Sequence, residues 1–240
     1  MKKIAAFFDI DGTLYRSSLM VEHFKKLIKY ELIDEKNWVD HARNTFIDWD
    51  NRTGNYDDYL LEVCELYVDA LKGIKCDDIE FATKQVIKTK ADRVYKYTRA
   101  QIKKHIEQGH IVIFISGSPD FLVKKMAEKY GATDFSGSKY IMRDGEFSGE
   151  VVPMWDSASK NMEIQKFIDK YDIDLESSYA YGDTHGDINM LRKVGHPIAI
   201  NPTDELLSNI RNDSELLDKT DIIVERKDVL YKLKADVEIL

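Results

Sequence analysis

The stretch IAAFFDIDGT, residues 4–13, joins a short apolar run to two acidic residues and a turn. Five apolar residues in a row are typical of a strand that is buried on both faces, as in a parallel sheet covered by helices. Asp9 and Asp11 follow this run directly, and Gly12 and Thr13 permit the chain to turn there. Because ligands of open α/β sheets bind at the carboxyl ends of strands, both carboxylates can face one site. Solvated aspartates at an ordinary turn are the alternative interpretation.

Short apolar runs of this kind recur along the chain and alternate with amphipathic stretches of helical period. The runs that indicate strands are residues 111–115, 179–181, 197–200 and 221–224, and the helical stretches between them include residues 120–130, 159–170 and 203–211. Regular alternation of strands and helices predicts an α/β fold whose core is a doubly wound, Rossmann-like parallel sheet.

One long interval, between the first two strands, breaks this alternation. It has little strand signal and is expected to form helices over residues 17–33, 35–49, 56–72 and 77–108. An insertion of this length predicts a separate all-helical cap domain over residues 16–97, with residues 1–15 and 98–240 forming the catalytic α/β core. Within the core, residues 137–152 contain Arg-Asp-Gly between two strand-like pieces, which predicts a β-hairpin flap.

The composition narrows the classes of partner. The chain has 240 residues, 43% of them hydrophobic and 32% charged, with a formal net charge of −8. An acidic chain without a basic block disfavours binding to nucleic acid or anionic lipid. Its apolar runs are too short for a membrane span or a signal peptide. Cys64 and Cys76 belong to no CxxC pair, so we expect reduced thiols and a cytoplasmic location.

Two further segments supply groups that can bind an anion. In IVIFISGSPD, residues 111–120, Ser116 and the Gly117 amide can form an anion site where the strand leads into a helix. The simpler alternative is that Ser116 or Ser118 caps that helix. Lys160 lies in the first turn of another helix, where the helix dipole disfavours a cation. A phosphate partner explains that position, and a solvent-exposed lysine is the alternative.

The fourth segment, YAYGDTHGDINML, supplies a second pair of carboxylates. Gly182 and Asp183 end a short apolar strand, and Asp187 follows four residues later. A carboxylate-rich strand end suits Mg²⁺, which prefers oxygen ligands, while an ordinary capped helix is the alternative. Together the four segments supply a nucleophile, a metal site and groups that hold negative charge, which is the set that phosphoryl transfer requires.

At these residues the sequence resembles the haloacid dehalogenase superfamily of phosphatases, and within it the branch that includes phosphoserine phosphatase. The four motifs of the family match, in the same order, Asp9–Thr13, Ser116, Lys160 and Gly182–Asp187. The match spans essentially the whole chain, and the helical insertion falls where this branch carries a cap. We therefore expect a phosphoric monoester hydrolase.

The resemblance implies a role for the acidic residues. Asp9 is expected to attack phosphorus and form an aspartyl phosphate, while Asp11 acts as general acid and then as general base. Mg²⁺ is expected to be bound by the Asp9 carboxylate, the Asp11 backbone carbonyl and Asp183. A phospho-receiver module is a competing interpretation, and Asp11 argues against it because a receiver needs no general acid.

The same resemblance implies how the phosphoryl group is bound. Ser116, the Gly117 N–H and Lys160 are expected to hold the phosphoryl oxygens. Thr13 and Asp187 are expected to support the site, with Asp187 orienting Lys160 or a water molecule at the metal. The partner of such a site is a small phosphorylated metabolite.

The choice of substrate depends on positions where the chain departs from the phosphoserine enzymes. These usually carry Ser where this chain has Gly12, and a Glu near the position of Ser18, for which Glu22 is a poor substitute. Arg43 or Arg52 could bind a substrate carboxylate, but no motif decides between them. We therefore expect a small phosphomonoester. Phosphoserine itself, or a phosphotransferase or mutase reaction through the same aspartyl phosphate, are the alternatives.

Overall fold

The computed structural model describes residues 2–34, 36, 43–51, 53, 56–154 and 157–238. Its contacts divide the chain into two compact units. Unit 1 comprises Met1–Ser18, Ala91–Ser138 and Pro153–Leu240, and unit 2 comprises Leu19–Lys90 and Lys139–Val152. Among the described residues, no helix combines the length and the apolar character that crossing a membrane requires.

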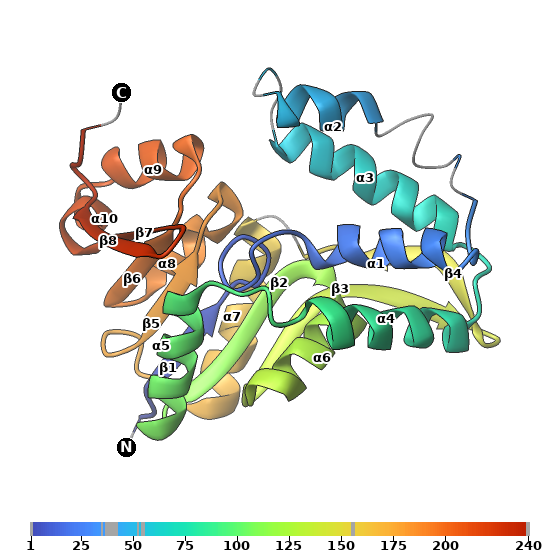
Figure 1. Ribbon diagram of the computed structural model, residues 1–240. Helices are drawn as coiled ribbons and strands as arrows, with labels where there is room; N and C mark the ends of the chain where they lie inside the picture. Colours follow the sequence, from blue (N-terminus) through green and yellow to red (C-terminus); the bar gives the residue numbers. More distant parts are fainter. Residues whose placement is uncertain are drawn as a thin grey trace. The chain divides into compact units, whose positions relative to one another are not determined.

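Unit 1 is built on a sheet whose strand order is β3-β2-β1-β5-β6-β7-β8 (Figure 1). Neighbouring strands are parallel from β3 through β7, and β8 is antiparallel to β7. The strands are β1 (Ala5–Phe8), β2 (Ile111–Pro119), β3 (Asp134–Arg143), β5 (Tyr179–Gly182), β6 (His196–Ile200), β7 (Asp221–Arg226) and β8 (Val229–Lys234). The chain leaves β1 on one side for β2 and later returns to the other side for β5. The strand order therefore reverses beside β1, where such sheets bind ligands.

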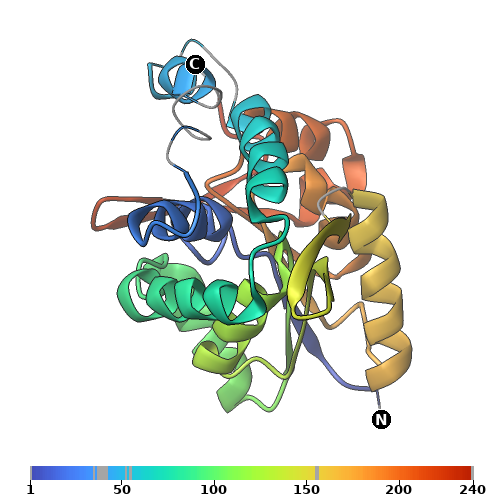
Figure 2. The same ribbon diagram turned by 90° about the vertical axis from the view of Figure 1, so that its right-hand side faces the viewer.

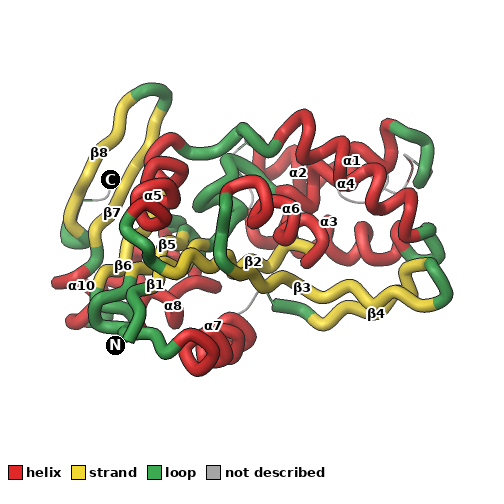
Figure 3. Tube along the Cα trace, turned by 90° about the horizontal axis from the view of Figure 1, so that it is seen from below, coloured by secondary structure: helices red, strands yellow, loops and turns green. Residues whose placement is uncertain are grey.

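Helices cover both faces of this sheet. Figure 3 shows α5 (Lys96–Glu107) and α6 (Asp120–Tyr130) on one face, and α7 (Ser157–Tyr171) and α8 (Ile188–Lys193) on the other. The turn η2 (His185–Asp187) precedes α8, while α9 (Asp204–Arg211) and α10 (Ser214–Lys219) lie between β6 and β7 in the chain. All four residues of β1 are fully buried, which explains its uninterrupted apolar sequence. The predicted α/β fold class is confirmed.

The chain between residues 77 and 108 is not one helical stretch, as the periodicity led us to expect. It forms α4 (Cys76–Lys90) and α5, separated by a short extended segment. In that segment the Tyr95 N–H donates to the Leu14 carbonyl at 2.9 Å, and the Arg93 carbonyl accepts from the Arg16 N–H at 3.0 Å. Because the loop after β1 satisfies these backbone groups, the segment does not need helical hydrogen bonds.

Unit 2 contains four helices among its described residues and also part of the sheet. The helices are α1 (Leu19–Lys29), α2 (Arg43–Asp50), α3 (Tyr56–Leu71) and α4. The second half of β3 pairs with β4 (Glu146–Val152) in a hairpin, and its turn residues Asp144 and Gly145 have φ of 51° and 84°. Positive φ at both positions is typical of a type I′ turn, which agrees with the predicted hairpin.

The hairpin belongs to unit 2 because the α3–α4 connection is bonded to it. The Gly73 N–H donates to the Phe147 carbonyl, the Phe147 N–H donates to the Ile74 carbonyl, and the Cys76 N–H donates to the Gly145 carbonyl, at 2.9, 3.0 and 2.8 Å. An insertion of residues 16–97 alone would be wholly helical. The second unit also contains a β-hairpin. Strand residues that begin at Lys139, about fifty positions after Lys90, complete it.

A buried histidine joins α5 to the sheet of unit 1. His105 is 2% exposed, and its Nε2 lies 2.9 Å from the Tyr181 hydroxyl. Its Nδ1 lies 2.9 Å from Nδ1 of His110. Burial, helped by the nearby His110 and Lys104, lowers the pKa of His105 to about 4. The folded protein therefore holds this ring neutral.

We expect this ring to make unit 1 less stable in acid. An unfolded histidine has a pKa of about 6.5, so the unfolded chain binds the proton first as the pH falls. The neutral ring contributes fully to the free energy of unfolding above pH 6.5, and this contribution is lost progressively down to about pH 4. The total loss is on the order of 2–3 kcal/mol. Between pH 6.5 and pH 4, the free energy of unfolding measured with urea should fall less for His105→Gln than for the parent. The exposed His196 on β6 provides the control, since His196→Gln should keep the parent dependence.

Candidate active site

The loop after β1 turns tightly and brings DIDGT beside the end of β5. The N–H groups of Leu14 and Tyr15 both donate to the Ile10 carbonyl, at 2.8 and 2.7 Å. Gly12 has a φ of 83°, and a Cβ at this position would lie 1.9 Å from Oδ2 of Asp183. Only glycine combines this backbone conformation with so close an approach. The turn therefore explains why Gly12 follows the two aspartates.

A buried lysine bridges two of the predicted carboxylates. Nζ of Lys160, in the first turn of α7, donates to Oδ1 of Asp9 at 2.7 Å and to Oδ1 of Asp187 at 2.6 Å. All three side chains are buried, with Lys160 only 4% exposed. In Figure 2, α7 packs along one side of the sheet that carries β1 and β5. Lys160 is therefore not the solvent-exposed lysine of the alternative interpretation.

The spacing of Asp183 and Asp187 has a local explanation. Oδ2 of Asp187 accepts from the N–H groups of Asp183 and Thr184, at 3.0 and 3.2 Å, across the turn η2. A Cβ at Gly182 would lie 2.4 Å from Cβ of Asp187, so this glycine permits the chain to fold back. Asp187 thus caps the start of the turn η2 with one oxygen and holds Lys160 with the other. Across the site, Thr13 Oγ1 donates to Oδ1 of Asp183 at 2.8 Å.

Burial and the neighbouring charges shift the pKa values of Asp9, Asp183 and Lys160. Burial raises the pKa of Asp9 well above its usual range; the Lys160 ammonium opposes this, and the Asp187 carboxylate adds to it. Burial likewise raises the pKa of Asp183, and the nearby Asp9 raises it further. Although burial alone would lower the pKa of Lys160, the carboxylates of Asp187 and Asp9 raise it above its ordinary value. The lysine is therefore charged at neutral pH.

The donor set fits a hard divalent cation. Oxygen atoms of Asp9, Asp183 and Asp187 lie within 4.8 Å of one another, and one ammonium faces these three carboxylates, which leaves a formal charge of −2. Oδ2 of Asp9 and Oδ2 of Asp183 accept no hydrogen bond from the residues that the structure describes. Both oxygens of Asp187 are engaged already. Asp9 and Asp183 are therefore the carboxylates best suited to bind a cation such as Mg²⁺.

Asp11 lies in the same loop with a different partner. Its carboxylate is half-buried, and Oδ2 accepts a short hydrogen bond from the Ser118 hydroxyl. The Ser18 hydroxyl lies 3.5 Å from the same oxygen. Residue patterns alone did not identify the contact between Ser118 and Asp11. Its only trace in the sequence is the position of Ser118 shortly after the apolar run 111–115.

The predicted phosphate-binding loop lies at the end of β2. Ser116 is buried, and its Oγ accepts from the Ser118 N–H at 3.2 Å. The Gly117 carbonyl accepts from the Ser138 hydroxyl at 2.7 Å. Within the described part of the chain, no hydrogen bond joins Ser116 or Gly117 to Asp9 or Lys160. The helix-cap alternative is wrong, because α6 begins at Asp120 without a capping side chain.

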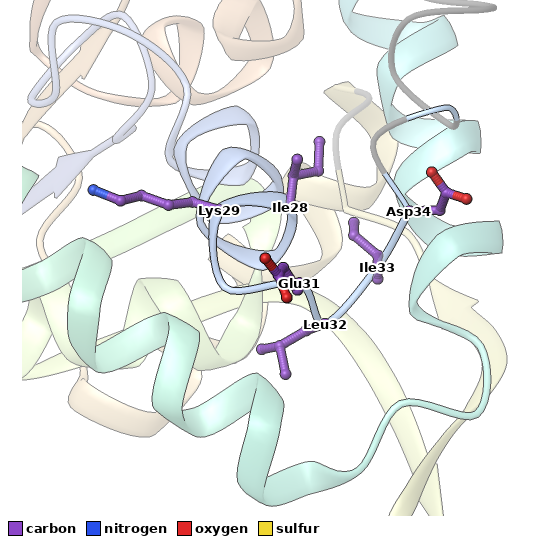
Figure 4. Close-up of a pocket in the computed structure, with 6 residues that line it drawn as sticks. All are labelled: Ile28, Lys29, Glu31, Leu32, Ile33 and Asp34. Carbon is purple, nitrogen blue, oxygen red and sulfur yellow. The ribbon is translucent and has the colours of Figure 1, made fainter.

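The residues considered for substrate choice are less informative. Glu22 is buried in unit 2, and its carboxylate lies 3.3 Å from Nζ of Lys90. Arg52 and the side chain of Arg43 lie outside the described residues. Figure 4 shows a surface hollow in unit 2 that contains none of the predicted site residues; its lining is Ile28, Lys29, Glu31, Leu32, Ile33 and Asp34.

Comparison with known proteins agrees with this geometry. The family model of haloacid dehalogenase-like hydrolases matches residues 6–192. The chain belongs to this family. Its membership confirms the predicted family and the predicted enzyme class, a phosphatase of the haloacid dehalogenase type.

Relatives within the haloacid dehalogenase-like hydrolases place the chain in the phosphoserine phosphatase-like branch. It is 29% identical over 243 residues to a phosphoserine phosphatase of Methanocaldococcus jannaschii, covering 97% of each chain. It is 27% identical over 205 residues to an "Inhibition of morphological differentiation protein" of Streptomyces azureus, covering 84% of this chain and 73% of that one. A solved phospho-aspartyl intermediate analogue of phosphoserine phosphatase shares the fold, with a TM-score of 0.61, 24% identity and coverage of 95% and 96%.

Proposed function

We propose that this protein is a magnesium-dependent phosphatase that hydrolyses a small phosphomonoester through an aspartyl phosphate on Asp9. The observation that carries the proposal is the buried arrangement of Asp9, Lys160 and Asp187 beside Asp183, at the carboxyl ends of β1 and β5. Structural ion pairs rarely bury two carboxylates around one ammonium with a third carboxylate beside them, because the uncompensated charge is costly. An arrangement of this kind is suited to a cation and an anionic substrate.

In the first step, a carboxylate oxygen of Asp9 attacks phosphorus as the bond from phosphorus to the leaving oxygen breaks. Asp11 donates a proton to that oxygen, so an alcohol leaves and an aspartyl phosphate remains. In the second step, water attacks phosphorus, Asp11 accepts a proton from the water, and the bond to Asp9 breaks. Inorganic phosphate is released and both carboxylates return to their starting state.

The remaining residues bind and orient the phosphoryl group. Lys160 uses two of its three N–H donors on carboxylates, which leaves one for a phosphoryl oxygen. Ser116 and the Gly117 N–H are proposed to bind the other oxygens. Asp9, Asp183 and the Asp11 carbonyl would hold Mg²⁺, which supplies charge that offsets the repulsion between a carboxylate nucleophile and a phosphate dianion.

The substrate is proposed only as a small phosphomonoester. Similarity to a protein named phosphoserine phosphatase supports phosphoserine as one candidate. Against it, Gly12 and Ser18 depart from the pattern of those enzymes, and the Glu22 carboxylate faces Lys90 rather than being available to an amine. No observation favours phosphotransferase or mutase activity over hydrolysis. A cytoplasmic location remains a prediction from the sequence.

A panel of phosphorylated metabolites that includes phosphoserine tests the proposal. Phosphate release is measured for each compound, with the Asp9→Asn variant as the blank. We expect one or a few small phosphomonoesters to be hydrolysed well above that blank. Release no faster than the blank for every compound, including a generic aryl phosphate, would overturn the proposed function. Transfer of phosphate to an added alcohol in preference to water would favour the phosphotransferase alternative.

Removal of divalent metal provides a separate test of the cofactor. We expect EDTA to lower turnover of an aryl phosphate by more than about tenfold, because Lys160 is then the only cation left among the proposed site residues to offset the repulsion between nucleophile and substrate. Excess Mg²⁺ should restore the parent rate, and excess Ca²⁺ serves as a control for nonspecific ionic effects. Turnover that does not respond to EDTA would contradict the metal assignment while leaving the nucleophile assignment intact.

A further inference from the structure

We propose that Ser118 is a positioning residue, which fixes the orientation of the general acid and base Asp11 by a hydrogen bond from its hydroxyl to Oδ2 of that residue. This inference rests on the proposed function. None of the motifs in the sequence points to Ser118, for which the sequence offered only the role of a helix cap.

The first observation is where the hydroxyl of Ser118 points. A serine just before a helix usually accepts from the first free N–H groups of that helix. Here the cap position of α6 is Pro119, and the Phe121 N–H is accepted by Oδ1 of Asp120 at 2.9 Å. Ser118 therefore does not cap α6, and its hydroxyl donates to Asp11 instead.

The second observation is that the backbone of this serine is held firmly. Ser118 is 4% exposed, and its N–H donates to the Ser116 hydroxyl at 3.2 Å. A Cβ at Gly137 would lie 2.9 Å from the Ser118 carbonyl oxygen, so β3 packs closely against this loop. The Ser138 hydroxyl donates to the Gly117 carbonyl and accepts from the Met154 N–H. A hydroxyl on so fixed a backbone can favour one rotamer of the Asp11 carboxylate.

The chemical consequence concerns which oxygen of Asp11 carries the proton. A hydroxyl that donates to Oδ2 makes that oxygen an acceptor, so the transferable proton lies on Oδ1. In the first step the proton moves from Oδ1 to the leaving oxygen while the bond from phosphorus to that oxygen breaks. In the second step Oδ1 takes a proton from the attacking water. Without Ser118, Oδ2 loses its short hydrogen bond, and the fraction of molecules with Oδ1 directed at the leaving group falls.

Substrates with different leaving groups distinguish this role from a structural one. An alkyl phosphate needs its leaving oxygen protonated, whereas p-nitrophenolate leaves without a proton. We expect Ser118→Ala to lower kcat/KM for an alkyl phosphate about tenfold or more, and kcat/KM for p-nitrophenyl phosphate less than about threefold. Ser118→Thr keeps the hydroxyl and should restore most of the loss. Ser136→Ala, at a serine of β3 that donates to Glu163 instead, is the matched control and should leave both values unchanged.

Each outcome of this experiment has one meaning. Equal losses of kcat/KM on both substrates, or no rescue by threonine in a variant whose thermal unfolding matches the parent, would overturn the role of Ser118. Such results would leave the phosphatase function standing, because the parent would still hydrolyse both esters. A parent chain that hydrolyses neither ester above the Asp9→Asn blank would overturn the proposed function and this inference with it.

Discussion

Replacing Asp9 by Asn is expected to reduce hydrolysis of any phosphomonoester by a factor on the order of 10⁴ or more, as removal of a nucleophile does in other enzymes. The Asn amide has nearly the shape of the carboxylate but cannot form the acyl phosphate. The fold should survive, because Lys160 keeps its 2.6 Å contact with Asp187 and one buried carboxylate fewer repels its neighbours. Turnover of an aryl phosphate and the midpoint of thermal unfolding should be measured together.

A rapid acid quench gives a more direct reading of the same residue. With a substrate labelled in its phosphoryl group, the parent should retain label on the protein and Asp9→Asn should retain none. Asp92→Asn is the matched control, since this exposed carboxylate pairs with Lys129 on the surface and should not affect turnover or labelling. Parent-like turnover in a folded Asp9→Asn variant would show that another group attacks phosphorus.

The strands of the core were predictable because strands buried on both faces have uninterrupted apolar sequences. Residues 4–8, 111–115, 179–181, 197–200 and 221–224 are apolar runs, and each corresponds to a strand of unit 1. The β8 strand was not recognised, because Val229–Lys234 is largely exposed at the sheet edge and carries two lysines. The break between α4 and α5 was missed for a different reason. It depends on hydrogen bonds to Leu14 and Arg16, some eighty residues earlier in the chain.

In the candidate site, too, residues determined by their sequence neighbours were predictable, whereas contacts between residues far apart in the chain were not. Gly12 and Gly182 were recognisable because each follows or precedes an acidic residue at a strand end, and the structure shows that a Cβ at either would collide with Asp183 or Asp187. The contact of Ser118 with Asp11 joins residues 107 positions apart, so helix-cap statistics gave the wrong partner for Ser118. Attachment of the hairpin to unit 2 was unpredictable for the same reason.

Replacing Lys160 by Met is expected to weaken both the fold of unit 1 and its chemistry. The ammonium is the charge that compensates Asp9 and Asp187, at 2.7 and 2.6 Å, and its side chain is almost fully buried. Removing one member of a buried charge group leaves the others uncompensated, which typically costs 3–5 kcal/mol. We expect a loss on the order of this size in the free energy of unfolding, measured with urea in the presence of EDTA. Turnover should fall on the order of 10²–10³-fold, because a cation aimed at the phosphoryl oxygens is lost.

A double-mutant cycle separates the charge effect from loss of packing. In an Asp9→Asn background, Lys160→Met should destabilise the protein less than in the parent, because one of the carboxylates left behind is already neutral. If packing alone were responsible, the loss of unfolding free energy would be equal in both backgrounds. Lys166→Met is the control on the same helix, where the lysine side chain is 69% exposed and pairs with Glu163, and it should change the free energy of unfolding by less than about 1 kcal/mol. Comparable stability of the Lys160→Met and Lys166→Met variants would contradict the claim that the buried ammonium compensates the carboxylates of the site.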